Sequence, residues 1–140
     1  MSDGKLLVIG CGNIGGAIID GVVKAESYLP ENVICCDTDE SKLAGLAKEH
    51  GVRTTSNASE VVDDVQTVLL AVKPYLVKQV IGGLSDKIKK RKDLLLISVA
   101  AGVKVESISS LLGSDLKITR VMPNLPCTIG KGISAIYGKD

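Results

Sequence analysis

Apolar and polar positions along the chain form two alternating patterns. Nearly continuous apolar runs cover residues 5–9, 32–36, 52–55, 67–72, 94–99, 117–122 and 133–137. Between most of these runs, apolar residues recur every three or four positions. The short runs predict strands buried on both faces, and the wider spacing predicts helices with one buried face. Strands alternating with helices predict an α/β fold, a Rossmann-type doubly wound, mainly parallel sheet with helices on both faces.

The helices are expected around residues 14–22, 40–50, 57–60, 74–84 and 105–112. The apolar repeat of the first helix starts at Ile14. Thr38 or Asp39 can cap the second helix at its start, and Gly51 closes it. Pro74 suits the first turn of the fourth helix, where its missing N–H costs nothing.

Composition narrows the classes of function. The length of 140 residues fits a single domain, residues 1–140, and 45% hydrophobic against 24% charged residues indicates an ordered core. Three tyrosines, with no Phe or Trp, offer few surfaces for base stacking, and a net charge of +1 gives no general attraction to nucleic acid or to anionic lipid. We therefore expect no nucleic-acid or membrane partner.

The cysteines and the histidine indicate the compartment and limit the chemistry. Cys11, Cys35, Cys36 and Cys127 contain no C-x-x-C pair, and no signal peptide is recognisable, so we expect a cytoplasmic protein. His50 is the only histidine and precedes a helix end, where a positive charge is favourable. We predict no metal site, because no partner stands at ligand spacing in the sequence.

The turn after the first strand carries the clearest functional motif. Gly10, Gly12 and Gly15 fit the spacing G-x-G-x-x-G. In this fingerprint the first glycine permits a tight turn, the second lets the backbone approach a pyrophosphate, and the third lets helix and strand pack closely. The N–H groups that open the helix then favour an anion. The turn predicts a dinucleotide site.

Other candidate residues follow the remaining strands. In a doubly wound sheet the ligand lies beyond the carboxyl ends of the strands, so segments distant in sequence converge on one crevice. The positions to consider are residues 10–15, Asp37, residues 71–74, residues 100–102 and residues 122–124. This convergence is stronger evidence for a ligand site than the glycines alone.

Asp37 stands 22 residues after Gly15, close to the distance at which an acidic residue accepts hydrogen bonds from the adenosine ribose. Its carboxylate would repel a 2′-phosphate, which favours NADH over NADPH as cofactor. The alternative is an ordinary capping or turn aspartate. Ser41 and Lys42 leave a second alternative open, since a shifted loop would let them meet a phosphate.

Two further residues have both a chemical and a structural interpretation. Lys73 lies at a strand end as a candidate acid, but if the substrate is reduced as a cation, such as a cyclic imine, an ammonium would oppose that charge, and an anionic contact or a structural role is then favoured. Cys11 lies where a helix N-terminus can lower a thiol pKa, although a small residue that merely fits the turn is the simpler interpretation. No catalytic residue is assigned.

The motifs together resemble the pyrroline-5-carboxylate reductase family. The resemblance rests on four segments: VIGCGNIGGAI at 8–18, LLAVKPYLV at 69–77, LISVAAGV at 96–103 and RVMPNLPCTIGKGISAIYG at 120–138. The AVKP and MPN-x-P segments are more specific than the glycine turn. Leu125 stands where Thr is common in that family.

The resemblance implies a set of cofactor-binding residues. It places Gly10, Gly12, Asn13, Ile14 and Gly15 at the pyrophosphate, Ala71, Val72, Lys73 and Pro74 along the adenosine and phosphates, and Ala100, Ala101, Met122, Pro123 and Asn124 toward the nicotinamide. Cys11, inside the turn, and Asp37, by its spacing, complete the predicted set. Asp37 departs from the basic or hydroxyl residues often found there in members that use NADPH.

The resemblance also implies an activity, hydride transfer from NADPH or NADH to the C=N bond of 1-pyrroline-5-carboxylate. Family members continue into a helical domain that makes a homo-oligomer and completes the substrate pocket, and we expect this domain to be absent from residues 1–140. Two alternatives stay open: a stand-alone dinucleotide-binding or sensing module, and a related β-hydroxyacid or prephenate-type dehydrogenase.

Overall fold

The computed structural model describes residues 4–91, 93–100, 102–112, 117–123 and 133–139. The strands are β1 (Leu6–Ile9), β2 (Val33–Cys36), β3 (Arg53–Thr55), β4 (Thr67–Leu70), β5 (Leu95–Ser98), β6 (Lys117–Pro123) and β7 (Ile133–Lys139). The helices are α1 (Asn13–Lys24), α2 (Glu40–His50), α3 (Val77–Ile88) and α4 (Val105–Leu112). Short 3₁₀ helices are η1 (Pro30–Asn32), η2 (Ala58–Glu60), η3 (Val62–Asp64) and η4 (Pro74–Leu76).

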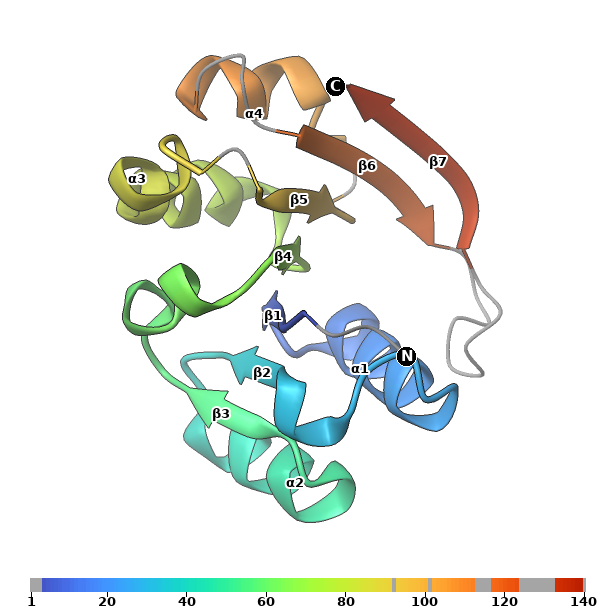
Figure 1. The fold of residues 1–140 in the computed structure, drawn as a ribbon. Coiled ribbons are helices and arrows are strands. Elements are labelled where there is room, and N and C mark those ends of the chain that lie inside the picture. Colours follow the sequence, from blue (N-terminus) through green and yellow to red (C-terminus); the bar gives the residue numbers. More distant parts are fainter. Residues whose placement is uncertain (1–3, 92, 101, 113–116, 124–132, 140) are drawn as a thin grey trace.

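The strands of the described residues form one sheet in the order β3-β2-β1-β4-β5-β6-β7. Strands β1 to β6 pair in parallel, and β7 pairs antiparallel with β6. Figure 1 shows this twisted sheet with α1 on one side and α3 and α4 on the other. The predicted doubly wound, mainly parallel sheet is confirmed. Because the chain proceeds outward from β1 to β3 and then returns to β4 on the other side, the order reverses between β1 and β4, where such folds bind ligands.

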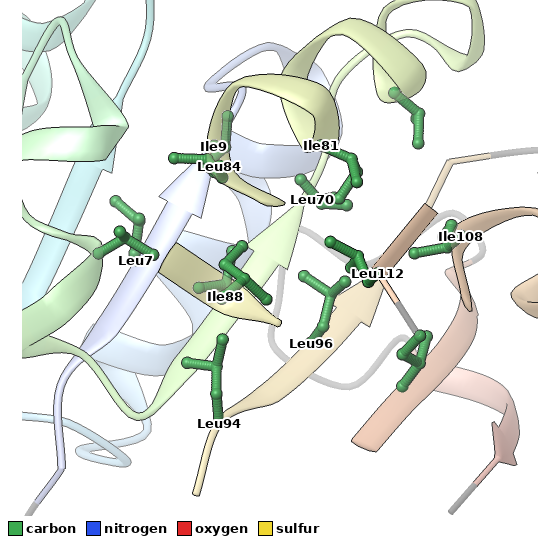
Figure 2. Packing of buried hydrophobic residues seen from close by; sticks show 14 of the residues in the cluster. Leu7, Ile9, Leu70, Ile81, Leu84, Ile88, Leu94, Leu96, Ile108 and Leu112 are labelled. Atoms are coloured by element: carbon green, nitrogen blue, oxygen red, sulfur yellow. The ribbon is translucent and has the colours of Figure 1, made fainter. Parts of the chain in front are cut away.

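Two hydrophobic cores hold the layers together, one on each face of the sheet. The core shown in Figure 2 joins side chains of the strands to α3 and α4 and includes Leu7, Ile9, Leu70, Leu96, Ile81, Leu84, Ile88, Ile108 and Leu112. The other core packs Ile19 of α1 and Leu43 of α2 against Val8 and Cys35. Each fully buried Leu or Ile contributes roughly 1.5–3 kcal/mol, so these aliphatic side chains compensate for the scarcity of aromatic ones.

Most predicted helix ends are confirmed. Asp39 caps α2 by accepting hydrogen bonds from the N–H groups of Ser41 and Lys42, and Gly51 ends that helix in the left-handed conformation with φ of 73°. Asn57 caps only a single 3₁₀ turn, η2. None of the helices in the described part of the chain is long and apolar enough to cross a membrane.

Two expectations about the first and fourth helices are corrected. Ile14 starts the apolar repeat of α1 but is 44% exposed, because it lies in the first turn of the helix at the edge of a pocket, and Ile19 is the residue fully buried in that helix. Pro74 opens the short helix η4, and α3 itself begins only at Val77.

Candidate functional site

The turn after β1 is built by close backbone contacts with β4. Gly10 has φ of +95°, and its N–H donates to the carbonyl of Cys36 at 2.9 Å. A Cβ at Gly10 would lie 2.7 Å from the carbonyl oxygen of Ala71. A Cβ at Gly15 would lie 1.9 Å from the carbonyl oxygen of Gly10. The first and third glycines of the motif are therefore required by packing, as the fingerprint predicts.

The middle glycine is in a different environment. A Cβ built on Gly12 meets nothing within 4 Å, and its φ of −75° suits any residue. The protein itself therefore places no steric demand for glycine at this position. Gly12 also lines a pocket, as a glycine that lets a pyrophosphate approach the backbone is expected to do.

The N-terminus of α1 lacks the partners that a helix start usually has. Gly12 is the N-cap, and within the described residues no side chain caps this end and no acidic residue lies in the first turn. Asn13 and Ile14 are exposed there. The N–H groups of this turn are thus free for an anion, and the helix macrodipole adds a favourable positive potential.

A pocket of about 960 Å³ opens in front of this helix end. Its size suits a dinucleotide, since small-molecule and cofactor sites typically enclose about 300–1,000 Å³. It spans the carboxyl ends of β1, β2, β4 and β5, where the strand order reverses.

The pocket brings together most of the residues singled out in the sequence. Its lining includes Gly10, Cys11, Gly12, Asn13, Ile14, Asp37, Ala71, Val72, Lys73, Pro74 and Ala100. Gly15 does not line it and packs behind the turn. Ala101 and Asn124 lie outside the described residues, and Met122 and Pro123 are described only as the backbone end of β6. The cofactor contacts of all these residues remain predictions.

Asp37 holds the glycine turn to the end of β2. Its Oδ2 accepts the backbone N–H of Cys11 at 2.9 Å, and its Oδ1 accepts the N–H of Asp39 at 2.9 Å. Asp37 therefore has the structural role of a turn aspartate, while Asp39 is the residue that caps α2. Each carboxylate oxygen has a second acceptor site, so Asp37 can also accept from a ribose hydroxyl in the pocket that it lines.

The segment that follows adds a positive charge beside this carboxylate. Thr38 and Lys42 line the pocket, whereas Ser41 hydrogen-bonds to the Asp39 carboxylate through its hydroxyl at 2.9 Å. The backbone N–H of Lys42 and the Ser41 hydroxyl hold the pKa of the Asp39 carboxyl below its usual value of 3.8. A carboxylate and an ammonium thus lie at the same end of the pocket.

Lys73 follows β4 and is exposed where the chain enters η4. It lines the pocket, and its ammonium has no hydrogen-bond or ion-pair partner among the described residues, whereas its backbone carbonyl accepts from the N–H of Leu76. An unpaired ammonium here can contact an anionic group of a ligand. No described side chain orients it as a proton donor.

Cys11 belongs to a buried group of thiols. It is 4% exposed, and its Sγ donates to the carbonyl of Cys36 at 3.5 Å. A hydrogen bond from the Cys35 side chain lowers the pKa of Cys11, and the same contact together with burial raises the pKa of Cys35. Burial raises the pKa of Cys36 to about 11. The burial of Cys11 favours the interpretation that a small residue fits this turn.

Sequence reasoning missed two walls of the pocket. Ser56, Asn57 and Ser59 line it after β3, and the same strand-end rule applied to that strand would have found them. Gln79 and Gly83 line it from α3. These two stand four residues apart on one helix face, but their polar or small side chains resemble any solvent-facing pair, so no sequence signal distinguishes them.

With this geometry in place, the class of protein is defined. The chain belongs to the oxidoreductase family described as NADP oxidoreductase, coenzyme F420-dependent, whose profile matches residues 5–102. Among individual proteins, it is similar to pyrroline-5-carboxylate reductases. It is 33% identical over 132 residues to that of Escherichia coli K12, which is 94% of this chain and 48% of that protein.

Solved structures agree with this similarity. The pyrroline-5-carboxylate reductase of Coxiella burnetii superposes with a TM-score of 0.92 at 30% identity, covering 99% of this chain and 51% of that one. The Plasmodium falciparum pyrroline carboxylate reductase with NADP bound gives a TM-score of 0.80 at 27% identity, covering 94% of this chain and 47% of that one. The resemblance seen in the motifs is confirmed, and the chain spans about half the length of these relatives.

Proposed function

We propose that the chain is the dinucleotide-binding part of a pyrroline-5-carboxylate reductase, which transfers hydride from NAD(P)H to the C=N carbon of 1-pyrroline-5-carboxylate. One observation carries the proposal: the open glycine turn and residues 71–74 line one pocket in a chain 33% identical to such an enzyme. The product of this transfer is proline, a saturated cyclic amine.

The pocket fits a dinucleotide at its pyrophosphate end. The phosphates would lie against the uncapped start of α1 and over Gly12, where no Cβ intervenes. The N–H groups of this turn supply hydrogen bonds without the cost of desolvating a basic side chain. Lys73, at the pocket wall, supplies a mobile positive charge for the same anion.

At the adenosine end the proposal favours NADH. The Asp37 carboxylate would accept from a ribose hydroxyl and would repel a 2′-phosphate. Lys42, which lines the same end, opposes this effect. The relative from Plasmodium falciparum was solved with NADP bound, so binding of both cofactors, with unequal affinity, is the expectation.

In the proposed reaction, this chain positions the cofactor and does not itself supply a reacting group. Bound NAD(P)H supplies the hydride, and the residues at the end of β5, Val99 and Ala100, form a nearly buried apolar wall that would exclude water beside the reacting carbon. A protonated imine needs no strong protein acid, which agrees with the absence of an oriented donor among the described residues. Lys73 would oppose the cationic imine and is therefore assigned to anion binding.

The whole protein is proposed to be a homo-oligomer whose remaining part completes the substrate pocket. The three described cysteines, Cys11, Cys35 and Cys36, are free, which supports a reducing compartment such as the cytoplasm. On this proposal the 140-residue chain binds cofactor but reduces the substrate poorly or not at all.

Parallel fluorescence titrations of the chain with NADH and NADPH test the proposal, followed by assay with 1-pyrroline-5-carboxylate. Saturable binding of either cofactor, with little turnover, supports it. Failure to bind either cofactor would overturn the binding site. Rapid turnover by this chain alone would overturn the claim that the substrate pocket needs further residues.

A further inference from the structure

Three potential metal ligands meet on the side of the molecule away from the pocket. Asp20 lies in the second half of α1, and Glu49 and His50 are the last residues of α2. None of them lines the cofactor pocket. One ligand atom from each of the three lies within 4.8 Å of the other two. The fold therefore gathers an imidazole and two carboxylates from two helices at one point.

The distances within this group suit a shared ion better than a hydrogen bond. His50 Nε2 lies 3.6 Å from Asp20 Oδ1 and 3.8 Å from Glu49 Oε1. A hydrogen bond between such atoms would measure about 2.7–3.2 Å. Ligands held about 2.0–2.2 Å from a tetrahedral metal are separated by about 3.3–3.6 Å. The first distance falls at the upper end of this range, and the second requires only a small movement of Glu49.

Burial and orientation distinguish this group from a surface cluster of acids. The His50 side chain is only 9% exposed, and its Nε2 faces the two carboxylates without a hydrogen bond from any described residue. Asp20 is 20% exposed, whereas Glu49 is 71% exposed and free to close over an ion. A buried imidazole nitrogen directed between carboxylate oxygens is a preformed ligand.

The neighbouring charge leaves the site attractive to a cation. Lys24 pairs with Asp20 Oδ2 at 3.1 Å, on the oxygen that His50 does not approach. Oδ1 of Asp20 therefore stays available, and the Lys24 contact would orient the carboxylate as outer-shell partners of metal ligands do. The two carboxylates outnumber the one ammonium, so the fixed charges around the site favour a cation.

We propose that Asp20, Glu49 and His50 form a binding site for a divalent transition-metal ion, with Zn²⁺ as the ion whose tetrahedral geometry the spacing fits. Water would complete the coordination shell. An imidazole ligand disfavours Ca²⁺ and Mg²⁺, which prefer oxygen ligands only. The ion would join α1 to α2 and stabilise the fold. The sequence did not predict this site because Asp20 stands 30 residues before His50 and only the packing of the two helices brings them together.

The test is thermal unfolding of the untagged chain, first treated with chelator and then titrated with Zn²⁺. We expect saturation at one equivalent and a rise of several degrees in the midpoint at saturating Zn²⁺. In His50→Gln the rise should be lost, and in Glu49→Gln the affinity should fall at least about tenfold. Glu106→Gln, an exposed glutamate on α4, is the matched control and should behave as the wild type.

Co²⁺ provides a second readout that does not depend on stability. Tetrahedral nitrogen and oxygen ligation gives visible bands without the near-ultraviolet charge transfer of a thiolate ligand. Such bands in the wild type and their loss in His50→Gln support the site. An unchanged midpoint with Zn²⁺ in the wild type, or equal Zn²⁺ and Co²⁺ binding in His50→Gln, overturns it. Neither the unfolding midpoint nor the Co²⁺ spectrum involves the cofactor, so the result of this test is independent of the proposed enzymatic function.

Discussion

The two segments that line the pocket at β1 and β2 are built by different physical means. The turn from Gly10 to Gly15 is held by backbone atoms in contact, with Cβ positions that would lie 2.7 and 1.9 Å from carbonyl oxygens at its two ends. Residues 37–42 are held by side-chain hydrogen bonds to nearby N–H groups at a mostly exposed surface. Both segments face the same pocket.

The fold requires glycine in the first segment, whereas the residues of the second segment can vary with the ligand. Substitution at Gly10 or Gly15 changes the packing of α1 on the sheet, so the shape of the proposed pyrophosphate site is fixed with the fold. Substitution after β2 alters groups at the surface, where only the contact of Asp37 with the Cys11 N–H reaches the glycine turn. If this segment contacts the adenosine, as proposed, cofactor preference can change while the sheet stays the same.

The largest effect is expected for Gly15→Ala. The added Cβ would overlap the carbonyl oxygen of Gly10, and both partners are backbone, so the helix must shift. We expect a loss of about 3 kcal/mol or more in the free energy of unfolding, measured by urea denaturation. Gly16→Ala is the control, because its Cβ would lie 3.8 Å from the nearest atom and alanine favours a helix. Equal destabilisation by both changes would contradict the role given to Gly15.

Gly12→Ala should weaken NADH binding without changing the stability of the fold. The added Cβ meets no described atom within 4 Å, and the poorer N-cap that alanine makes is offset by the freedom that the unfolded chain loses, so the free energy of unfolding should change by less than about 0.5 kcal/mol. The methyl group would occupy the approach of the pyrophosphate, and we expect NADH affinity to fall at least about tenfold, or about 1.4 kcal/mol. Fluorescence titration measures the affinity. Unaltered NADH affinity would place the phosphates elsewhere.

Asp37→Ser tests the second segment. The part-buried N–H of Cys11 loses a carboxylate acceptor, and we expect a loss of about 1–2 kcal/mol in unfolding free energy. Removal of the negative charge should also shift the ratio of affinities toward NADPH. Titration of both cofactors on both chains gives that ratio. If the wild-type chain already binds NADPH much more tightly than NADH, the role assigned to Asp37 is wrong.

The smallest effect concerns the cap of α2. The pKa of Asp39 is lowered in the fold by hydrogen bonds from Lys42 and Ser41, so its contribution to stability is present above the unfolded value of 3.8. This contribution is lost as the pH falls below that value through the folded pKa. Urea denaturation at several pH values should show a shallower acid loss in Asp39→Asn, which keeps a good cap without titrating. An acid dependence identical to the wild type would contradict this assignment.

Local signals made much of the fold predictable. Strands buried on both faces appear in the sequence as short apolar runs. The ends of α2 are marked by a capping aspartate and by a glycine in the left-handed conformation, and both residue types are recognisable in the sequence. Because all parallel strands deliver their carboxyl ends to one edge, the residues after them could be expected to converge. Eleven of the predicted residues line the pocket for this reason.

Features set by long-range packing were not predictable. The exposure of Ile14 follows from its place in the lining of the pocket, and the lining at Gln79 depends on how α3 packs on the sheet. The hydrogen bond from Cys11 to Asp37 joins residues 26 positions apart. Periodicity describes one element at a time, whereas each of these features depends on the placement of two.

The most direct test of the central claim is one pair of NADH titrations, on the wild-type chain and on Gly12→Ala, with urea denaturation of both. If the glycine turn binds the pyrophosphate, the wild-type chain should bind NADH saturably and the variant should bind NADH at least about tenfold more weakly. The two chains should have equal free energies of unfolding. Equal NADH affinity in two equally stable chains would contradict pyrophosphate binding at this turn.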